Sequence, residues 1–257
     1  MKHNNTDQDK KQWEAFHSED SLKVLSSLKL KMQEELVSTI NELIGTSEIN
    51  KKNIVHLSDC KSHDNLPQSI KKTIDDAVQK LKIENEVVKR LANFYLVLLD
   101  INTYAYNCFL SEDDWEWRAF ARHIFTVLYE HRNSINPLLN TVIKTMKESL
   151  GTGVSLTAFI KAKKDFVKVI ESIADYAQSI RVNVDAHFDG DFEKRIRIIE
   201  GMSYFEIVKL LNVYWMKTAA LIHEMPPIIL ALQNYVFDSM HDVEHQLKEF
   251  IEAEIGK

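Results

Sequence analysis

The longest apolar pattern in the chain lies in residues 67–105, PQSIKKTIDDAVQKLKIENEVVKRLANFYLVLLDINTYA. Apolar side chains recur there every three or four residues, which is the spacing of one face of an α-helix. The pattern predicts one long helix that starts at Pro67. It weakens at residues 84–86, Glu-Asn-Glu, where we expect a kink or a locally exposed turn. The apolar positions are Ile70, Ile74, Val78, Leu81, Val88, Leu91, Tyr95, Leu98, Ile101 and Ala105.

Glycine and proline are scarce outside this stretch as well. The 257 residues include 6 Gly and 4 Pro, whereas average usage would give roughly 18 and 13. Turn-rich β-sandwiches and glycine-rich phosphate loops need more of these residues. The composition therefore predicts an all-α fold, a helical bundle with long antiparallel helices.

The N-terminal third is expected to contain one helix and one loop. Residues 1–18 are polar and are predicted to form a flexible arm. Leucine and isoleucine spacing predicts a helix over 20–44, and Gly45 is its natural stop. Residues 46–66 are polar and are expected to be a loop. The chain then divides into an N-terminal helix and loop over 19–66 and a helical-bundle domain over 67–257.

Helix start signals mark the remaining elements. Ser111 with Asp114 resembles a capping box that opens a helix to about Arg132. Asn136-Pro137 is expected to open a separate helix that ends at Gly151. Later helices are expected after Ser155, after the S-x-x-E capping box at Ser203, and after Pro226-Pro227, which begins a C-terminal helix over 226–255. Residues 195–199, RIRII, fit either a strand or a helix turn.

Charge and cysteine content exclude several classes of protein. The net charge of −6 gives no bulk attraction to nucleic acid or an anionic membrane, although a local basic cleft remains open. Cys60 and Cys108 form no CxxC pair, so they suit a reducing compartment and offer no zinc site or disulfide framework. No secretory signal or membrane-spanning segment is expected. We therefore expect a cytoplasmic protein with no membrane association and no cofactor.

Two clusters of chemically capable side chains have an ordinary structural interpretation. His241 and His245 stand in an H-x-x-E-H pattern, but a zinc site needs a third ligand, so a solvated helix face is favoured. Trp115, Trp117 and Phe120 share a helix with two arginines, Arg118 and Arg122. Core packing with partly buried arginine stems is favoured there, and a platform for stacking a base is the alternative.

The strongest candidate site lies near residue 185. Arg181-Val-Asn183-Val-Asp185-Ala-His187 follows an amphipathic helix and precedes Gly190. Basic residues lie on both sides of it in the sequence. They are Lys161, Lys163, Lys164 and Lys168 before it and the basic run Lys194, Arg195 and Arg197 after it. Arginine holds phosphate through paired donors, and histidine exchanges protons near neutral pH. Arg118 and His123 show a similar spacing, but they fall in the middle of a predicted helix.

An arginine followed after four to six residues by a histidine is the hallmark of the HEPN superfamily, which the chain resembles over about residues 90–224. Many HEPN proteins are metal-independent ribonucleases of toxin–antitoxin, abortive-infection and other defence systems. In them, motifs from two subunits meet at a dimer interface. The resemblance implies a HEPN-like core, a homodimer, an RNA substrate, and catalytic roles for Arg181, His187 and, in support, Asn183.

Two other functions remain open. Some HEPN proteins are inactive and act as partners of nucleotidyltransferases, and a toxin would have an antitoxin partner. Val182 directly follows the arginine, where active relatives often carry a polar residue, so a catalytically inactive HEPN-like protein is one alternative. The other is an unrelated helical protein that dimerises or binds a cognate partner through its long amphipathic helices.

Overall fold

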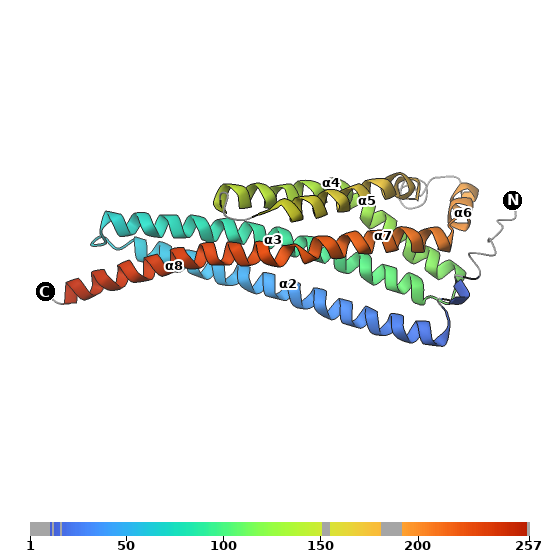
Figure 1. The fold of residues 1–257 in the computed structure, drawn as a ribbon, viewed down its shortest axis with the longest axis horizontal. Helices are drawn as coiled ribbons and strands as arrows, with labels where there is room; N and C mark the ends of the chain where they lie inside the picture. The colour runs from blue at the N-terminus through green and yellow to red at the C-terminus, as the bar shows by residue number, and fades with distance from the viewer. Residues whose placement is uncertain (1–10, 12, 16, 151–154, 181–191, 256–257) are drawn as a thin grey trace.

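The computed structural model describes residues 11, 13–15, 17–150, 155–180 and 192–255. Every regular element in these residues is an α-helix, and the longest helices run antiparallel to one another, which confirms the expected all-α bundle (Figure 1). None of the described helices is apolar enough, over a sufficient length, to cross a bilayer. The helices are α2 (Glu19–Lys61), α3 (Gln68–Leu110), α4 (Asp114–Leu150), α5 (Thr157–Ile180), α6 (Phe192–Glu200), α7 (Tyr204–His223) and α8 (Met225–Ile255).

Helices α2 and α3 form an antiparallel hairpin of two 43-residue helices that spans the molecule. Buried positions on α3 alternate at spacings of four and three from Ile70 to Phe109, the heptad pattern of a coiled coil. Hydrogen bonds between side chains connect the two helices along their length. The pairs are Lys29–Asn107 at 2.6 Å, Gln33–Thr103 at 3.0 Å, Ser47–Asn85 at 2.6 Å, Asn50–Glu84 at 2.9 Å and Lys61–Asp75 at 2.6 Å.

A buried polar layer interrupts the apolar interior of this hairpin. It consists of Ser47 and Asn50 on α2 and Glu84 and Asn85 on α3. Asn50 Nδ2 donates to a Glu84 carboxylate that is only 3% exposed, and burial raises the pKa of that carboxyl group. The polar layer separates the two hydrophobic clusters that the described residues form. The smaller cluster contains Leu57, Leu66, Ile70, Ile74, Ala77, Leu81, Val236 and Val243.

Helices α7 and α8 follow one another along α3 and run antiparallel to it (Figure 1). Trp215 on α7 donates its indole N–H to Asn102, and Thr73 on α3 donates to Gln246 near the end of α8. Ser203 caps α7 by accepting from the Glu206 amide, as the capping box predicts. The Pro226-Pro227 pair lies in the first turn of α8, where proline is tolerated, which confirms the expected C-terminal helix.

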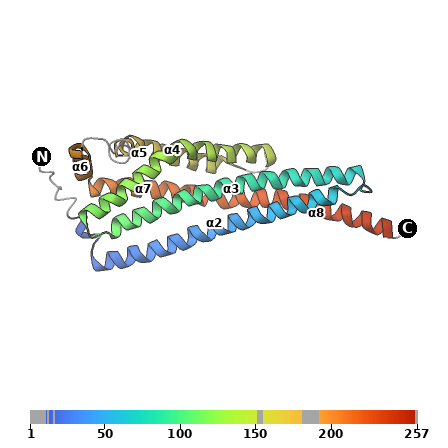
Figure 2. The ribbon, with the colours of Figure 1, turned by 180° about the vertical axis from the view of Figure 1, so that it is seen from behind.

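Helices α4 and α5 cover only one half of the long hairpin (Figure 2). They pack against the C-terminal half of α3 and against α7, and their buried residues belong to the larger cluster. The other half of the molecule is a three-helix assembly of α2, α3 and α8. The bundle therefore has a thick end, where five long helices meet, and a thinner end built around the smaller cluster.

The expected helix stop at Gly45 and the loop over 46–66 are wrong. Helix α2 continues through Gly45 to Lys61. The polar residues that suggested a loop include Ser47 and Asn50, which face α3 and bond to its polar side chains rather than to water. Only residues 62–67 connect the two helices.

The expected break at Asn136-Pro137 is also wrong, because α4 runs through Pro137 as one helix. Its buried stripe continues across the proline, with Leu128 and Ile135 before it and Leu139 and Val142 after it. Burial of these side chains offsets the backbone hydrogen bond that the proline cannot donate. Tertiary packing thus overrides the local stop signal.

The described helices also bear on the expectations for residues 195–199 and 84–86. Residues 195–199 belong to helix α6 and not to a strand. Of the kink or exposed turn expected at residues 84–86, the exposed turn is wrong, because α3 is helical throughout and Glu84 is buried in the polar layer.

Gly45 offers a direct test of the continuous helix. A Cβ added there would meet no other atom within 4 Å. Since alanine loses less backbone entropy in a helix interior, Gly45→Ala should stabilise the protein by about 0.5–1 kcal/mol. Urea unfolding measures this change, and Gly45→Pro serves as the opposite control because it should destabilise the protein strongly. Destabilisation by alanine would contradict a helical Gly45.

Glu84→Gln tests the buried carboxylate of the polar layer. Because the pKa of Glu84 is raised in the folded state, its contribution to stability is fully present below the unfolded pKa and decreases as pH rises through the folded value. Glutamine keeps an acceptor for Asn50 but carries no charge. We expect the variant to be more stable than the wild type by about 1 kcal/mol at pH 8, with the difference vanishing near pH 4.

The control for this comparison is Glu48→Gln, an exposed carboxylate on α2. Chemical denaturation at several pH values should show no pH-dependent difference between this control and the wild type. Equal pH profiles for Glu84→Gln and the wild type would show that the Glu84 carboxylate is not desolvated.

Candidate functional site

The residues predicted to be catalytic, Arg181, Asn183 and His187, lie outside the described residues. They belong to the stretch between the end of α5 at Ile180 and the start of α6 at Phe192. The structure therefore describes the two helices that flank the motif. Both helices connect to elements of the bundle, since α5 packs against α4 and α7, and α6 is followed directly by α7.

The basic residues on α5 divide into two groups. Lys161, Lys164 and Lys168 are exposed at helical spacing and form a positive strip on the outside of α5. Lys163 instead faces α4 and donates to Asn140 Oδ1 at 2.6 Å, and burial lowers the pKa of its ammonium group. On α6, Arg197 forms an exposed ion pair with Glu193 at 3.0 Å. Only the three exposed lysines thus present a continuous positive surface on the described flank.

The second arginine–histidine pair in the sequence does not form a site. Arg118 is only 5% exposed, forms an ion pair with Asp114, and lies over the ring of Trp117 at 4.5 Å. His123 is exposed and stacks on Tyr104, with the ring centroids 5.1 Å apart. Five residues of helix separate the two side chains by about 140° around the axis. They point in different directions and cannot hold one substrate.

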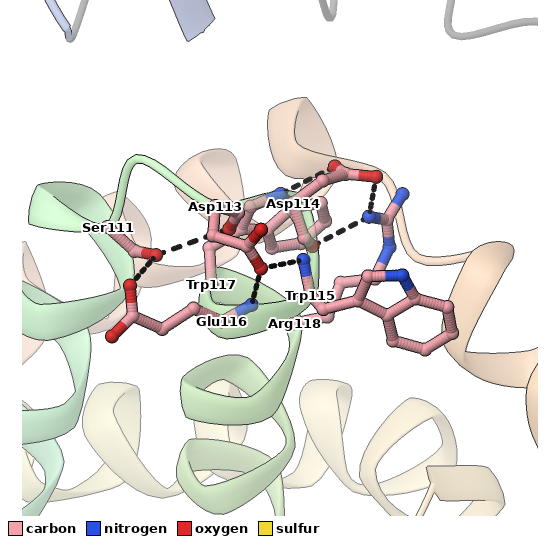
Figure 3. A network of polar contacts seen from close by, with 7 residues as sticks. All are labelled: Ser111, Asp113, Asp114, Trp115, Glu116, Trp117 and Arg118. Carbon is pink, nitrogen blue, oxygen red and sulfur yellow. Dashed lines mark hydrogen bonds and ion pairs between the residues drawn. The ribbon is translucent and has the colours of Figure 1, made fainter.

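The polar residues around Arg118 form the N-terminal cap of α4 (Figure 3). Asp113 Oδ1 accepts from the backbone amides of Trp115 and Glu116, at 2.8 and 2.9 Å. Ser111 does not cap the helix, contrary to prediction, but donates to the Glu116 carboxylate at 2.6 Å. The helix therefore starts two residues later than expected, with Asp113 rather than Ser111 as its cap. These carboxylates serve the helix terminus and are not paired as a catalytic acid and base.

The tryptophans of α4 have separate roles. Trp117 is 2% exposed and lies edge-on to Tyr204, with ring centroids 5.4 Å apart, so the core-packing interpretation is confirmed for it. Trp13, in the N-terminal segment expected to be an arm, lies edge-on to Tyr204 at 5.0 Å, and His17 bonds to the Ser111 carbonyl at 2.6 Å. Trp115 is exposed, so its indole ring is open to stacking with a base.

The histidines of α8 stand on an exposed helix face. His245 lies 3.5 Å from Glu249 on the same helix, and His241 is exposed near the ring of Phe237. Across the described ranges, no three His, Cys, Asp or Glu side chains gather in a way that could hold a metal ion.

A pocket of about 560 Å³ lies between α2 and α7, with α3 as its floor. Sequence reasoning missed it, because the lining comes from three helices that are far apart in the chain. Apolar lining residues such as Met32, Leu36 and Tyr95 also fit the ordinary core stripes of their helices when each helix is considered alone. The lining residues are Met32, Glu35, Leu36, Thr39, Tyr95, Asn102, Tyr106, Trp215, Thr218, Ala219, Ile222 and His223.

Comparison with models of known protein families gives no match, and neither do the searches of curated proteins and of solved structures.

Proposed function

We propose that this protein is a metal-independent endoribonuclease of HEPN type, in which Arg181 and His187 carry out the chemistry and Asn183 supports them. The observation that carries the proposal is the motif itself, between an amphipathic helix and a short basic helix. The all-α fold agrees with what the resemblance implies. The HEPN-like arrangement of the core over 90–224 is part of the proposal.

The proposed reaction needs no group from outside the chain. The 2′-oxygen of the RNA attacks the adjacent phosphorus as its proton leaves, and the bond from phosphorus to the 5′-oxygen breaks. His187 accepts the proton of the 2′-hydroxyl and returns it to the leaving 5′-oxygen, and Arg181 stabilises the negative charge on the phosphorane. The products are a 2′,3′-cyclic phosphate and a free 5′-hydroxyl. A homodimer would place two such motifs near one another.

The exposed lysine strip on α5 supports the choice of a polyanionic substrate. The whole protein carries a net charge of −6, so RNA must be attracted by a local surface. Lys161, Lys164 and Lys168 supply three adjacent cations on the helix that leads into the motif. Contacts of this kind position a phosphate backbone without reading its sequence.

The test is cleavage of bulk RNA in the presence of EDTA. His187→Ala and Arg181→Ala should each lower the rate by about 100-fold or more, and Asn183→Ala should lower it less. The matched controls are His123→Ala and Arg132→Ala, which change an exposed histidine and a half-buried arginine on α4, outside the motif and its flanking basic residues. Both should retain full activity. Replacing the three exposed α5 lysines with alanine should raise KM and leave kcat nearly unchanged.

Two results would defeat this proposal. One is equal cleavage by the wild type and His187→Ala, which would identify a contaminating nuclease. The other is the absence of cleavage by the wild type under every condition tried.

A second candidate function is supported by a separate observation, an exposed aliphatic stripe on α2. Leu30, Val37 and Ile44 are exposed and lie seven residues apart, so they share one face of the helix. Centred on Val37, the stripe is its own complement in an antiparallel pair of α2 helices, since Leu30 of one copy meets Ile44 of the other. This arrangement fits a non-enzymatic protein that forms a homodimer through α2.

Sedimentation analysis tests this second function. The wild type should sediment as a dimer, and Val37→Glu should sediment as a monomer because it buries an unpaired charge in the stripe. Ser38→Glu, on the neighbouring exposed face, should remain dimeric. A monomeric wild type, or a Val37→Glu variant that remains fully dimeric, would exclude association through this stripe.

A further inference from the structure

The pocket between α2 and α7 contains two buried tyrosines that point to a ligand. Tyr95 and Tyr106 line it and are only 5% and 7% exposed. Neither hydroxyl forms a hydrogen bond with another residue in the part of the chain that the structure describes. Neither hydroxyl oxygen is itself fully buried, so each is accessible from the pocket and can donate to a bound acceptor.

The ionisation state of these tyrosines makes them donors. Burial raises the pKa of Tyr95 to about 12 and also raises the pKa of Tyr106. Both side chains therefore keep their proton throughout the physiological range. A neutral phenol donates one hydrogen bond, and the matching ligand group is an acceptor such as a carbonyl oxygen.

A hydrogen-bonded pair, Asn102 on α3 and Trp215 on α7, fixes the side of the pocket that faces α2. Asn102 Oδ1 accepts from Trp215 Nε1 at 2.7 Å, while Asn102 Nδ2 donates to the Leu98 carbonyl at 2.7 Å. The indole ring of Trp215 also lies 5.6 Å from the ring of Tyr106, between centroids. These contacts fix the rings that line one end of the pocket before any ligand arrives, which reduces the entropy lost on binding.

The charge of the lining restricts the ligand further. Apart from Glu35 and His223, which are both exposed, the lining residues carry no ionisable group except the two tyrosines. No lysine or arginine contributes to the lining, so the pocket provides no cation to neutralise a carboxylate or a phosphate. Aliphatic and aromatic side chains supply most of its surface, and they favour burial of an apolar chain.

We propose that this pocket binds an uncharged, elongated apolar molecule that carries a hydrogen-bond acceptor such as a ketone or ester carbonyl. Tyr95 and Tyr106 are separated by eleven residues of α3, or about 16 Å along the helix axis. A chain of about twelve carbon atoms has a comparable length. The site is distinct from the Arg181 motif, and the proposal does not depend on ribonuclease activity.

The experiment is isothermal titration of the full chain with 2-dodecanone, compared with dodecanoate and dodecylamine below their micellar concentrations. The ketone should bind, and each charged molecule should bind at least tenfold more weakly. Tyr106→Phe removes one donor without changing the shape of the pocket. It should weaken ketone binding about five-fold, which corresponds to a net hydrogen bond of about 1 kcal/mol.

A matched pair of variants on α7 tests the location. Ala219 lines the pocket, whereas Met216 is exposed outside the lining. Ala219→Trp should abolish ketone binding by filling the space, whereas Met216→Trp should bind the ketone as the wild type does. Cooperative thermal unfolding shows that both variants are folded. Equal binding by the wild type and Ala219→Trp, tighter binding of the acid or the amine than of the ketone, or no ketone binding by the wild type would overturn the proposal.

Discussion

The hydrogen bond between Asn50 and Glu84 fixes how the two longest helices are aligned. Apolar heptad positions are nearly equivalent from one turn to the next, so they tolerate a shift of one heptad along the hairpin. A buried amide and a buried carboxylate do not tolerate such a shift, because each would then face an aliphatic side chain without a partner. Ser47 and Asn85 form a second bond of the same kind beside them. The polar layer therefore selects one register for α2 against α3.

This register determines what lies on the rest of α3. Helix α3 contacts α2, α4 and α8, and its residue Asn102 bonds to α7, so it is the common neighbour of most of the bundle. One face of α3 receives α2, and another receives α7 and α8 in succession. Helix α2 packs along α3, and Trp215 of α7 bonds to Asn102 of α3, while space remains between α2 and α7 near Tyr95 and Tyr106.

The spacing of apolar residues was sufficient to predict the helices but not to predict where each helix ends. The apolar stripe of 67–105 and the cap at Ser203 depend on neighbouring residues only, so they could be recognised without a structure. Gly45 and Pro137 are local stop signals that were misleading, because packing of distant helices outweighs a local cost of about 1–3 kcal/mol. Ser47 and Asn50 looked like loop residues because their partners on α3 are more than 30 residues away in sequence.

The Arg181 motif and the pocket also differ in how readily each can be recognised from sequence alone. The Arg181 motif is defined by residue types at short spacing, which makes it visible in a sequence, and the described residues show its flanking helices. Arg118 and His123 satisfy a similar spacing, yet the ion pair with Asp114 and the ring of Tyr104 hold them apart. The pocket has no sequence signature, because Thr39, Tyr106 and Trp215 become neighbours only through packing.

The polar layer and the pocket are connected through the rigidity of α2. Asn50 and Thr39 are eleven residues apart on this helix, or about 16 Å along its axis. A continuous helix transmits an axial shift along its length with little loss, whereas a loop over 46–66 would have absorbed it. A slip of α2 by one heptad would move every residue on it by about 10 Å and replace Met32 and Thr39 in the pocket wall. The bond at Asn50 thus defines the shape of a cavity that it does not touch, and the absence of a break at Gly45 is what makes this possible.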